Sequence, residues 1–323
     1  MPALDKVMDD KKKQLGNDFS VVIAVGDSVV YQRTTGDIAN LKTPSPIGAS
    51  SQWLTTALIL QLADEGKLSL DDPVSKYLPI FESYRRNYIT LRHCLTHQTG
   101  LGKEGSKLGG LFDKKKFASL DEEVTDILKK EIHANAGEEF RYSSYGPVVA
   151  ARVAEAVTKK RFDQLIRTKL FVPLGMRNTS FTTDDGSAPD PSGGANSTAT
   201  DLTKFLQMLL NNGKAGDKQV LSESALEEMR KIQVASAQIK NAPAADQGFS
   251  FALGTWTADK SAPQGGKAAS LVVPGLAGTW PEVDFHRGFV FLVFTRNFPG
   301  DQTAQPFLDL KQIADQHFPV KKN

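Results

Sequence analysis

The first candidate nucleophile along the chain is a serine that follows a glycine and an aspartate. Gly26-Asp27-Ser28 comes directly after the apolar run 21–25, and Asp315 and His317 near the end of the chain are a possible acid and base. A serine presented in this way needs a helix after it, whose N-terminal N–H groups would stabilise an oxyanion. Residues 29–31, Val-Val-Tyr, instead continue as a β-rich run. We therefore interpret residues 26–28 as the turn of a β-hairpin.

Histidine and cysteine show no pattern of a metal site. The chain has five histidines and one cysteine, and no histidine pair has metal-site spacing together with a third ligand. We therefore predict no metal and no cofactor. Cys94 lies among apolar residues, as is typical of a buried thiol, and has no partner for an internal disulfide. We expect His97 to make structural hydrogen bonds rather than to act as a base.

Charge and hydropathy exclude two classes of partner. The 323 residues include 39 Lys and Arg against 37 Asp and Glu, and the short lysine runs 114–116 and 129–130 are diluted by acidic residues 121–123. Nucleic-acid binding, which needs a basic stripe, is therefore not expected. The longest apolar runs have the length of strands, far below the roughly 18 residues of a membrane helix. Residues 1–5 lack the apolar core of a signal peptide, although Met1 could replace a removed leader, so the compartment stays open.

The predicted elements place strands at both ends of the chain. β-rich runs occupy residues 19–33 and several segments of 249–295, whereas the region from about 70 to 200 is rich in helical patterns. A strongly apolar helix follows the breakers Pro44 and Pro46, and a last helix is expected at 305–317. This order predicts an α+β fold with one sheet assembled from both chain ends.

Five segments resemble, in the same order, those of serine β-lactamase-like proteins. They are residues 53–77, 90–101, 136–144, 193–202 and 275–279. That superfamily contains class C β-lactamases, penicillin-binding DD-peptidases and family VIII esterases. The resemblance implies one β-lactamase/DD-peptidase-like domain over 1–323, an antiparallel sheet flanked by helices. Its sheet-bearing half would be 1–64 and 205–323, its helical half 65–204, and the cleft would lie between them. Family members are commonly periplasmic or secreted.

The same resemblance locates the catalytic motifs of the family. Its Ser-x-x-Lys, at the start of the long helix, falls on Ala49 and Gln52, and its Tyr-x-Asn on Tyr142 and Ser144. An alanine methyl cannot attack a carbonyl, and a neutral amide is no useful general base. Tyr142, the proton shuttle of the family, is retained as a candidate catalytic residue.

The third motif, Lys-Thr-Gly or His-x-Gly in the family, falls on residues 273–275, Val-Pro-Gly. The group that would face a substrate carboxylate is then absent. The resemblance implies that the backbone N–H groups of Ala49 and Leu276 still form an oxyanion hole. The predicted substrate-binding residues are Ala49, Gln52, Ser144, Val273, Gly275 and Leu276.

Other sources of a nucleophile remain open. Ser50 and Ser51 adjoin the vacant position, but their i+3 partners are Trp53 and Leu54, which are not bases. We interpret both serines as helix caps. If Ser50 attacks, the family pattern supplies only Tyr142 as its base. Alternatively, Ala49 was introduced by hand into a parent chain with Ser-x-x-Gln.

The leading hypothesis is a catalytically impaired family member that keeps a cleft for a small acyl, ester or peptide-like ligand. One rival is an active esterase or amidase that uses Ser50 or Ser51, or one silenced only by Ala49. Another is a partner-binding scaffold with a vestigial cleft.

Overall fold

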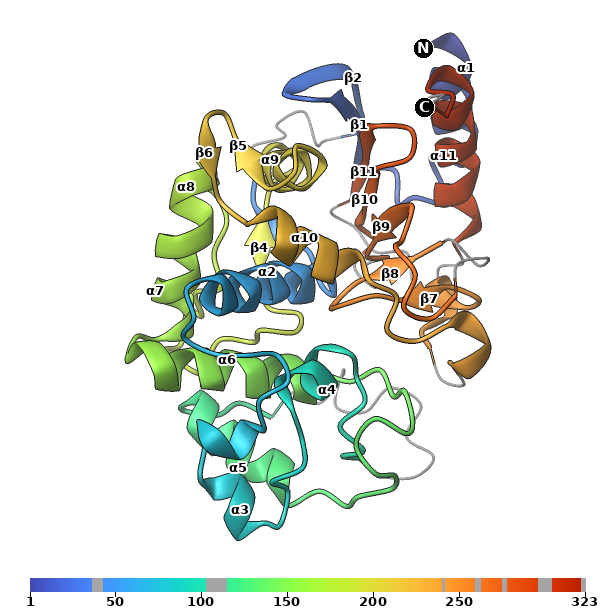
Figure 1. Cartoon of the computed structure of the whole chain (residues 1–323). Helices are drawn as coiled ribbons and strands as arrows, with labels where there is room; N and C mark the ends of the chain where they lie inside the picture. The colour runs from blue at the N-terminus through green and yellow to red at the C-terminus, as the bar shows by residue number, and fades with distance from the viewer. Residues whose placement is uncertain are drawn as a thin grey trace.

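A seven-stranded antiparallel sheet combines strands from both ends of the chain (Figure 1). The computed structural model describes residues 1–36, 43–102, 115–239, 242–258, 263–274, 278–295 and 304–320. In spatial order the strands are β2 (Ser28–Thr35), β1 (Phe19–Val25), β11 (Phe289–Thr295), β10 (Trp280–Asp284), β9 (Ser270–Val272), β8 (Trp256–Thr257) and β7 (Ser250–Phe251). β1 and β2 form the predicted hairpin, with Val25 opposite Ser28, so Ser28 is a turn-flanking residue and no nucleophile elbow.

The two central strands show why the sheet is buried on both faces. β1 and β11 pair so that Val22 lies opposite Leu292 and Ile23 opposite Phe291. Successive side chains of a strand point to opposite faces. Val22 and Leu292 accordingly join one apolar cluster, whereas Ile23 and Phe291 join another. Both faces of these strands thus need a cover of helices.

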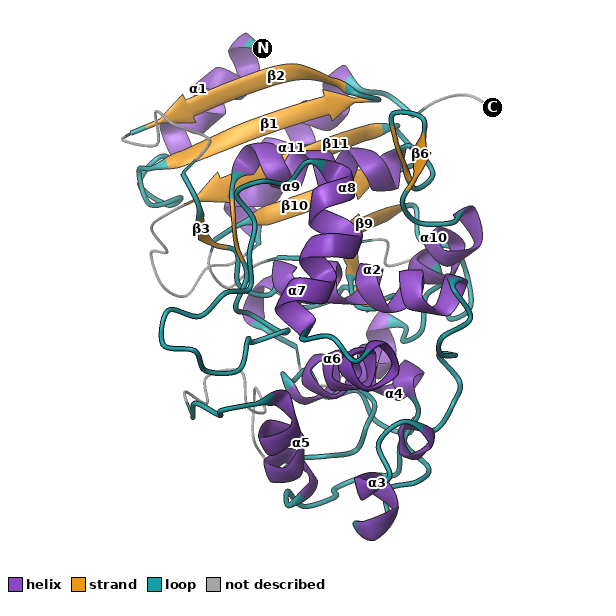
Figure 2. Ribbon diagram, turned by 90° about the vertical axis from the view of Figure 1, so that its left-hand side faces the viewer, coloured by secondary structure: helices purple, strands orange, loops and turns teal. Residues whose placement is uncertain are grey.

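Helices cover the two faces and extend away from one of them. α1 (Pro2–Lys11) and α11 (Gln305–His317) pack together on one face, and α9 (Ala199–Leu210) crosses the other (Figure 1). Figure 2 shows α2 (Ser50–Asp64) in the middle of the molecule, with α4 (Leu91–Leu95) and α6 (Tyr145–Thr158) farther from the sheet. Further α-helices of the described residues are α3 (Ile80–Ser83), α5 (Leu120–Leu128), α7 (Phe162–Ile166), α8 (Val172–Leu174) and α10 (Glu223–Arg230). Short two-stranded pairs are β3 (Ser45–Pro46) with β4 (Asn196–Ser197) and β5 (Lys214–Ala215) with β6 (Lys218–Gln219).

α2 is the central helix of the molecule. All its residues from Ser50 to Leu62 are buried, which is why its sequence is apolar on every side rather than on one stripe. It packs against α6 and α10. Trp53 contacts Phe205 edge-on at 5.6 Å between ring centroids and donates its indole N–H to the sulfur of Met229 at 3.1 Å.

The predicted elements differ from the structure mainly around residues 220–257. The expected strand over 249–253 shortens to β7, because Gly254 turns the chain at a φ of +69° and donates its N–H to the carbonyl of Leu95 at 3.0 Å. α10 was not predicted. It is capped by Ser222, whose hydroxyl accepts the N–H of Ala225 at 3.0 Å. The final helix, α11, has the predicted bounds.

A glycine fixes the contact between α4 and α6. A Cβ atom on Gly146 would lie 1.9 Å from the carbonyl oxygen of Cys94, which is a backbone atom and cannot move aside cheaply. We expect Gly146→Ala to lower the free energy of unfolding by about 2–3 kcal/mol, as measured by urea denaturation. Gly186→Ala is the control: it has open space and a φ of +74°, so only backbone strain of about 1 kcal/mol should appear. If both variants lost the same free energy of unfolding, the close contact between Gly146 and the carbonyl of Cys94 would be contradicted.

Candidate active site

The start of α2 is held by a neighbouring segment of the chain. β3 pairs with β4, and the N–H of Ile47 donates to the carbonyl of Ala195 at 3.0 Å. Ala49 is the N-cap residue of α2, and its residue surface is only 7% exposed. The predicted nucleophile position is therefore an alanine at the first turn of a buried helix.

Gln52 connects two ring systems. Its side-chain Nε2 donates to the phenol oxygen of Tyr142 at 3.2 Å, and its Oε1 lies 3.0 Å from Nε2 of His97. All three side chains are buried. The structure thus brings together Gln52 and Tyr142, two of the predicted site residues, and adds His97. The contact joins positions 45 residues apart, so spacing alone gave no signal for it.

The surroundings of His97 determine its protonation. The rings of Phe140, Tyr142 and Phe251 lie 4.5–5.7 Å from its ring between centroids. Burial among them lowers the pKa of His97 to about 3. Its Nδ1 accepts the backbone N–H of Ser143 at 3.3 Å. Because that N–H can only donate, Nδ1 carries no proton and the single ring proton is on Nε2.

Tyr142 is a neutral phenol in this environment. Burial, and after it the charge of the Asp246 carboxyl, raise the pKa of Tyr142 well above its usual range. Asp246 is itself buried, one of its carboxylate oxygens has no hydrogen bond to a described residue, and burial raises its pKa as well. Tyr142 therefore holds its proton at neutral pH and is not a ready base.

The two serines beside Ala49 do not cap α2. Ser51 accepts the backbone N–H of Ala195 at 3.0 Å, and the buried hydroxyl of Ser50 has no hydrogen-bond partner within the described ranges. The N-cap is Ala49, and no side chain caps this end. The capping interpretation is therefore wrong: Ser51 ties α2 to the segment before β4, and Ser50 makes no polar contact with a base.

The remaining predicted residues lie in different settings. Ser144 is half-buried at the N-cap of α6 and lines a small hollow with Lys115 and Phe117. Val273 is buried and donates its N–H to the carbonyl of Pro281 at 3.2 Å. Gly275 and Leu276, predicted to complete the oxyanion hole, lie outside the described residues.

The described part of the chain shows neither a cluster of metal ligands nor a helix that could span a membrane. Across those ranges, no three His, Cys, Asp or Glu side chains gather as a set of metal ligands. The helices described there are all too short or too polar to cross a membrane.

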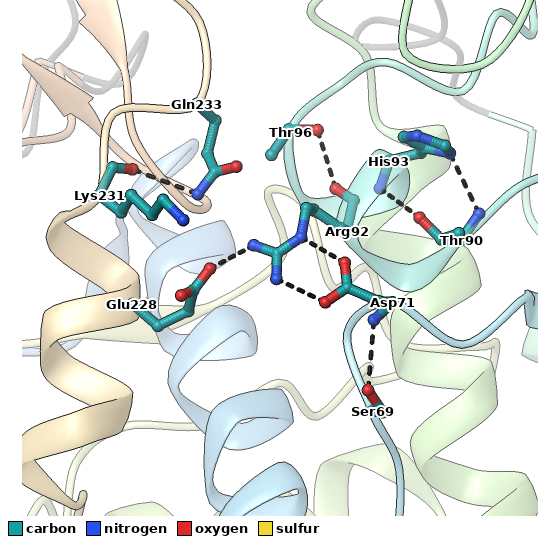
Figure 3. Close-up of polar contacts among 9 residues, drawn as sticks. All are labelled: Ser69, Asp71, Thr90, Arg92, His93, Thr96, Glu228, Lys231 and Gln233. Atoms are coloured by element: carbon teal, nitrogen blue, oxygen red, sulfur yellow. Dashed lines mark hydrogen bonds and ion pairs between the residues drawn. The ribbon is translucent and has the colours of Figure 1, made fainter. Parts of the chain in front are cut away.

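Ion pairs anchor the helix that leads to His97. Arg92 of α4 donates to both carboxylate oxygens of Asp71, at 2.6 and 2.9 Å, and also to Glu228 of α10 (Figure 3). A two-pronged Arg–carboxylate pair is geometrically specific. Thr90 caps α4 by accepting the N–H of His93 at 3.2 Å. These contacts fix the turn in which His97 takes its φ of +55°.

Comparison with known proteins identifies the family. A family model described as Beta-lactamase matches residues 7–313. The chain belongs to the beta-lactamase family. This confirms the resemblance seen in the sequence, and the beta-lactamase family explains the sheet made from both chain ends.

One known protein is similar to part of this chain in sequence, and two solved structures are similar to it in fold. Over 135 residues, 42% of this chain, the sequence is 34% identical to the teichoic acid D-alanine hydrolase of Staphylococcus aureus. The match covers only 32% of that relative's length. The structure of EstCE1, described as a hydrolase with promiscuous acyltransferase activity, has a TM-score of 0.80 at 20% identity, covering 96% of this chain and 98% of EstCE1. A family VIII carboxylesterase has a TM-score of 0.77 at 16% identity, covering 98% and 96%. The two structural likenesses confirm the predicted fold.

The buried His97 makes stability depend on pH in a defined direction. Its pKa is about 3 in the folded chain against 6.5 ordinarily, so its stabilising contribution is complete above pH 6.5 and is lost as the pH falls toward 3. Between pH 7 and pH 5, we expect His97 to account for a loss of about 2 kcal/mol in the free energy of unfolding. Urea denaturation of the wild type and His97→Phe at pH 7, 6 and 5 measures this difference.

The exposed His317 provides the control for that measurement. For His317→Gln, the free energy of unfolding should fall with pH as steeply as in the wild type. For His97→Phe, it should fall less steeply. Identical slopes for the wild type and His97→Phe would contradict the neutral, buried state of His97.

Proposed function

We propose that this beta-lactamase-family protein binds a small acyl, ester or peptide-like compound at the start of α2 and is catalytically impaired. The observation that carries the proposal is the hydrogen bond of 3.2 Å between Gln52 and Tyr142, directly beside Ala49. It joins two neutral groups at the positions where the family pattern expects a lysine and its tyrosine partner.

Proton transfer is the step that these residues do not support. Nucleophilic attack by a hydroxyl needs a nearby group that accepts its proton. The amide of Gln52 is not basic, Tyr142 keeps its proton, and His97 uses Nδ1 to accept the N–H of Ser143. None of these three side chains therefore offers a free basic lone pair at neutral pH.

The class of ligand is inferred from the relatives. The matched relative is named for hydrolysis of teichoic acid D-alanine, and the similar structures include a carboxylesterase. Ester and amide carbonyls are the groups such proteins have in common. The neutral residues around Ala49 suit a carbonyl compound without a required negative charge, since Gln52 and Val273 stand where the family pattern has cations.

An active hydrolase is the second candidate. The hydroxyl of Ser50 is buried, has no hydrogen-bond partner among the described residues and adjoins Ala49, so no described contact holds it away from a carbonyl. This candidate requires a base other than Gln52, His97 and Tyr142. It also requires that Ser50→Ala abolish turnover.

Restoring the serine and the lysine of the family motif should restore ester hydrolysis. We expect wild-type protein to hydrolyse p-nitrophenyl acetate no faster than background, and Ala49→Ser with Gln52→Lys to exceed the wild type by about 100-fold or more. A lysine at position 52 would be buried opposite the Nε2–H of His97, a donor that favours its neutral, basic amine. Initial rates measured by release of nitrophenolate test this.

Ser50→Ala, made in both backgrounds, is the matched control and should change neither rate. Ala49→Ser alone should gain little, because the base is still missing. Wild-type turnover that Ser50→Ala removes would support the second candidate instead. If Ala49→Ser with Gln52→Lys shows no turnover, the proposal that the start of α2 still binds the ligand would be contradicted.

A further inference from the structure

A single backbone donor fixes the direction of a chain of hydrogen bonds that ends at Tyr142. The N–H of Ser143 occupies Nδ1 of His97 at 3.3 Å, so the proton of His97 is on Nε2 and is donated to Oε1 of Gln52 at 3.0 Å. The amide orientation of Gln52 follows, with its NH2 group directed at the oxygen of Tyr142 at 3.2 Å. Reversing the amide would place two donors face to face at His97, so no other arrangement satisfies all three bonds.

Because each bond in this chain is donated toward Tyr142, the O–H of Tyr142 is left as a hydrogen-bond donor. Its oxygen accepts from Gln52, and among the described residues no hydrogen bond uses its own O–H as donor. A buried polar group without a partner is costly, and each one needs an explanation. Tyr142 is only 3% exposed, so bulk water does not readily supply one.

A second donor lies beside the phenol of Tyr142. The indole of Trp256, whose ring lies 5.6 Å from that of Tyr142 between centroids, is a hydrogen-bonding neighbour that lowers the pKa of the phenol. With the N–H groups of Gln52 and Trp256 both directed at its oxygen, Tyr142 can offer a further group only its O–H. A carbonyl oxygen accepts such a donor.

We propose that Tyr142 donates its O–H to the carbonyl oxygen of the ligand, and that His97 is a positioning residue that sets this polarity through Gln52. The inference rests on the proposed function, because it assumes a ligand at the start of α2. It assigns Tyr142 the role of a hydrogen-bond donor, opposite to that of a proton-accepting shuttle. No bond is made or broken in this role.

The chain of hydrogen bonds from Ser143 through His97 and Gln52 to Tyr142, here called the relay, can be tested without any ligand. Two-dimensional 1H–15N correlation of the histidine rings reports which nitrogen is protonated. We expect His97 to show a protonated Nε2 and an unprotonated Nδ1 in the folded chain at pH 7, with assignment by His97→Phe. A proton on Nδ1, or on both nitrogens, would overturn the relay.

The contact with a carbonyl is tested with phenylacetone, a ketone of the same shape as phenyl acetate but with no leaving group. Titration followed by NMR gives the Kd, and a 13C-labelled carbonyl reports hydrogen bonding by its shift. We expect Tyr142→Phe to weaken binding by about fivefold to tenfold and to abolish the bound carbonyl shift. Tyr31→Phe removes a hydroxyl that donates to Asp5 at the opposite edge of the sheet, on β2, and should leave both the Kd and the carbonyl shift unchanged.

A double-mutant cycle separates positioning from a structural role. His97→Phe keeps an aromatic ring among Phe140 and Phe251 but has no ring nitrogen. If His97 acts through Tyr142, His97→Phe and the double variant with Tyr142→Phe should bind as weakly as Tyr142→Phe alone. Additive losses would overturn the positioning role.

The outcomes separate this inference from the proposed function. Wild-type binding that Tyr142→Phe leaves intact would overturn the inference and keep the binding cleft. Absence of wild-type binding would contradict the proposed function, and the histidine shifts would then decide the relay alone.

Discussion

The hydrogen bond from the backbone N–H of Ser143 to Nδ1 of His97 determines the chemistry of this site. A backbone N–H has one role only, whereas an imidazole, an amide and a phenol can each donate or accept. One fixed donor therefore orients the three side chains that follow it. The result is a set of neutral groups, each compatible with burial, where a charged lysine would need compensation for its lost hydration.

The fold supports this arrangement by bringing three distant segments together. Gln52 comes from α2, His97 from the turn after α4, and Tyr142 from the segment before α6. The complete burial of α2 fixes the first, and the pairing of Arg92 with Asp71 and Glu228 anchors the helix before the second. The aromatic rings around His97 then exclude water, which keeps the relay uncharged.

Sequence reasoning predicted the fold and part of the site, for identifiable reasons. The continuous apolar runs within residues 19–25 and 289–295 predicted strands, and the apolar run after residue 53 predicted a helix, because both are local signals. The family resemblance selected Gln52 and Tyr142 as site residues but not their contact. Structural hydrogen bonds were expected for His97, but their partners were not, since these are set by a positive φ and by contacts 45 and 46 residues away. Ser51 was misinterpreted as a cap because its real partner, the N–H of Ala195, is 144 residues away.

The central claim is that no working nucleophile is present beside this neutral relay. Intact-mass spectrometry after incubation with a fluorophosphonate, a penicillin and an activated short-chain ester tests it most directly. The account predicts an unmodified wild-type mass with all three reagents, and an adduct on residue 49 once Ala49→Ser and Gln52→Lys are both present. A wild-type adduct that maps to Ser50 or Ser51 would contradict it and would make this chain an enzyme with a displaced nucleophile.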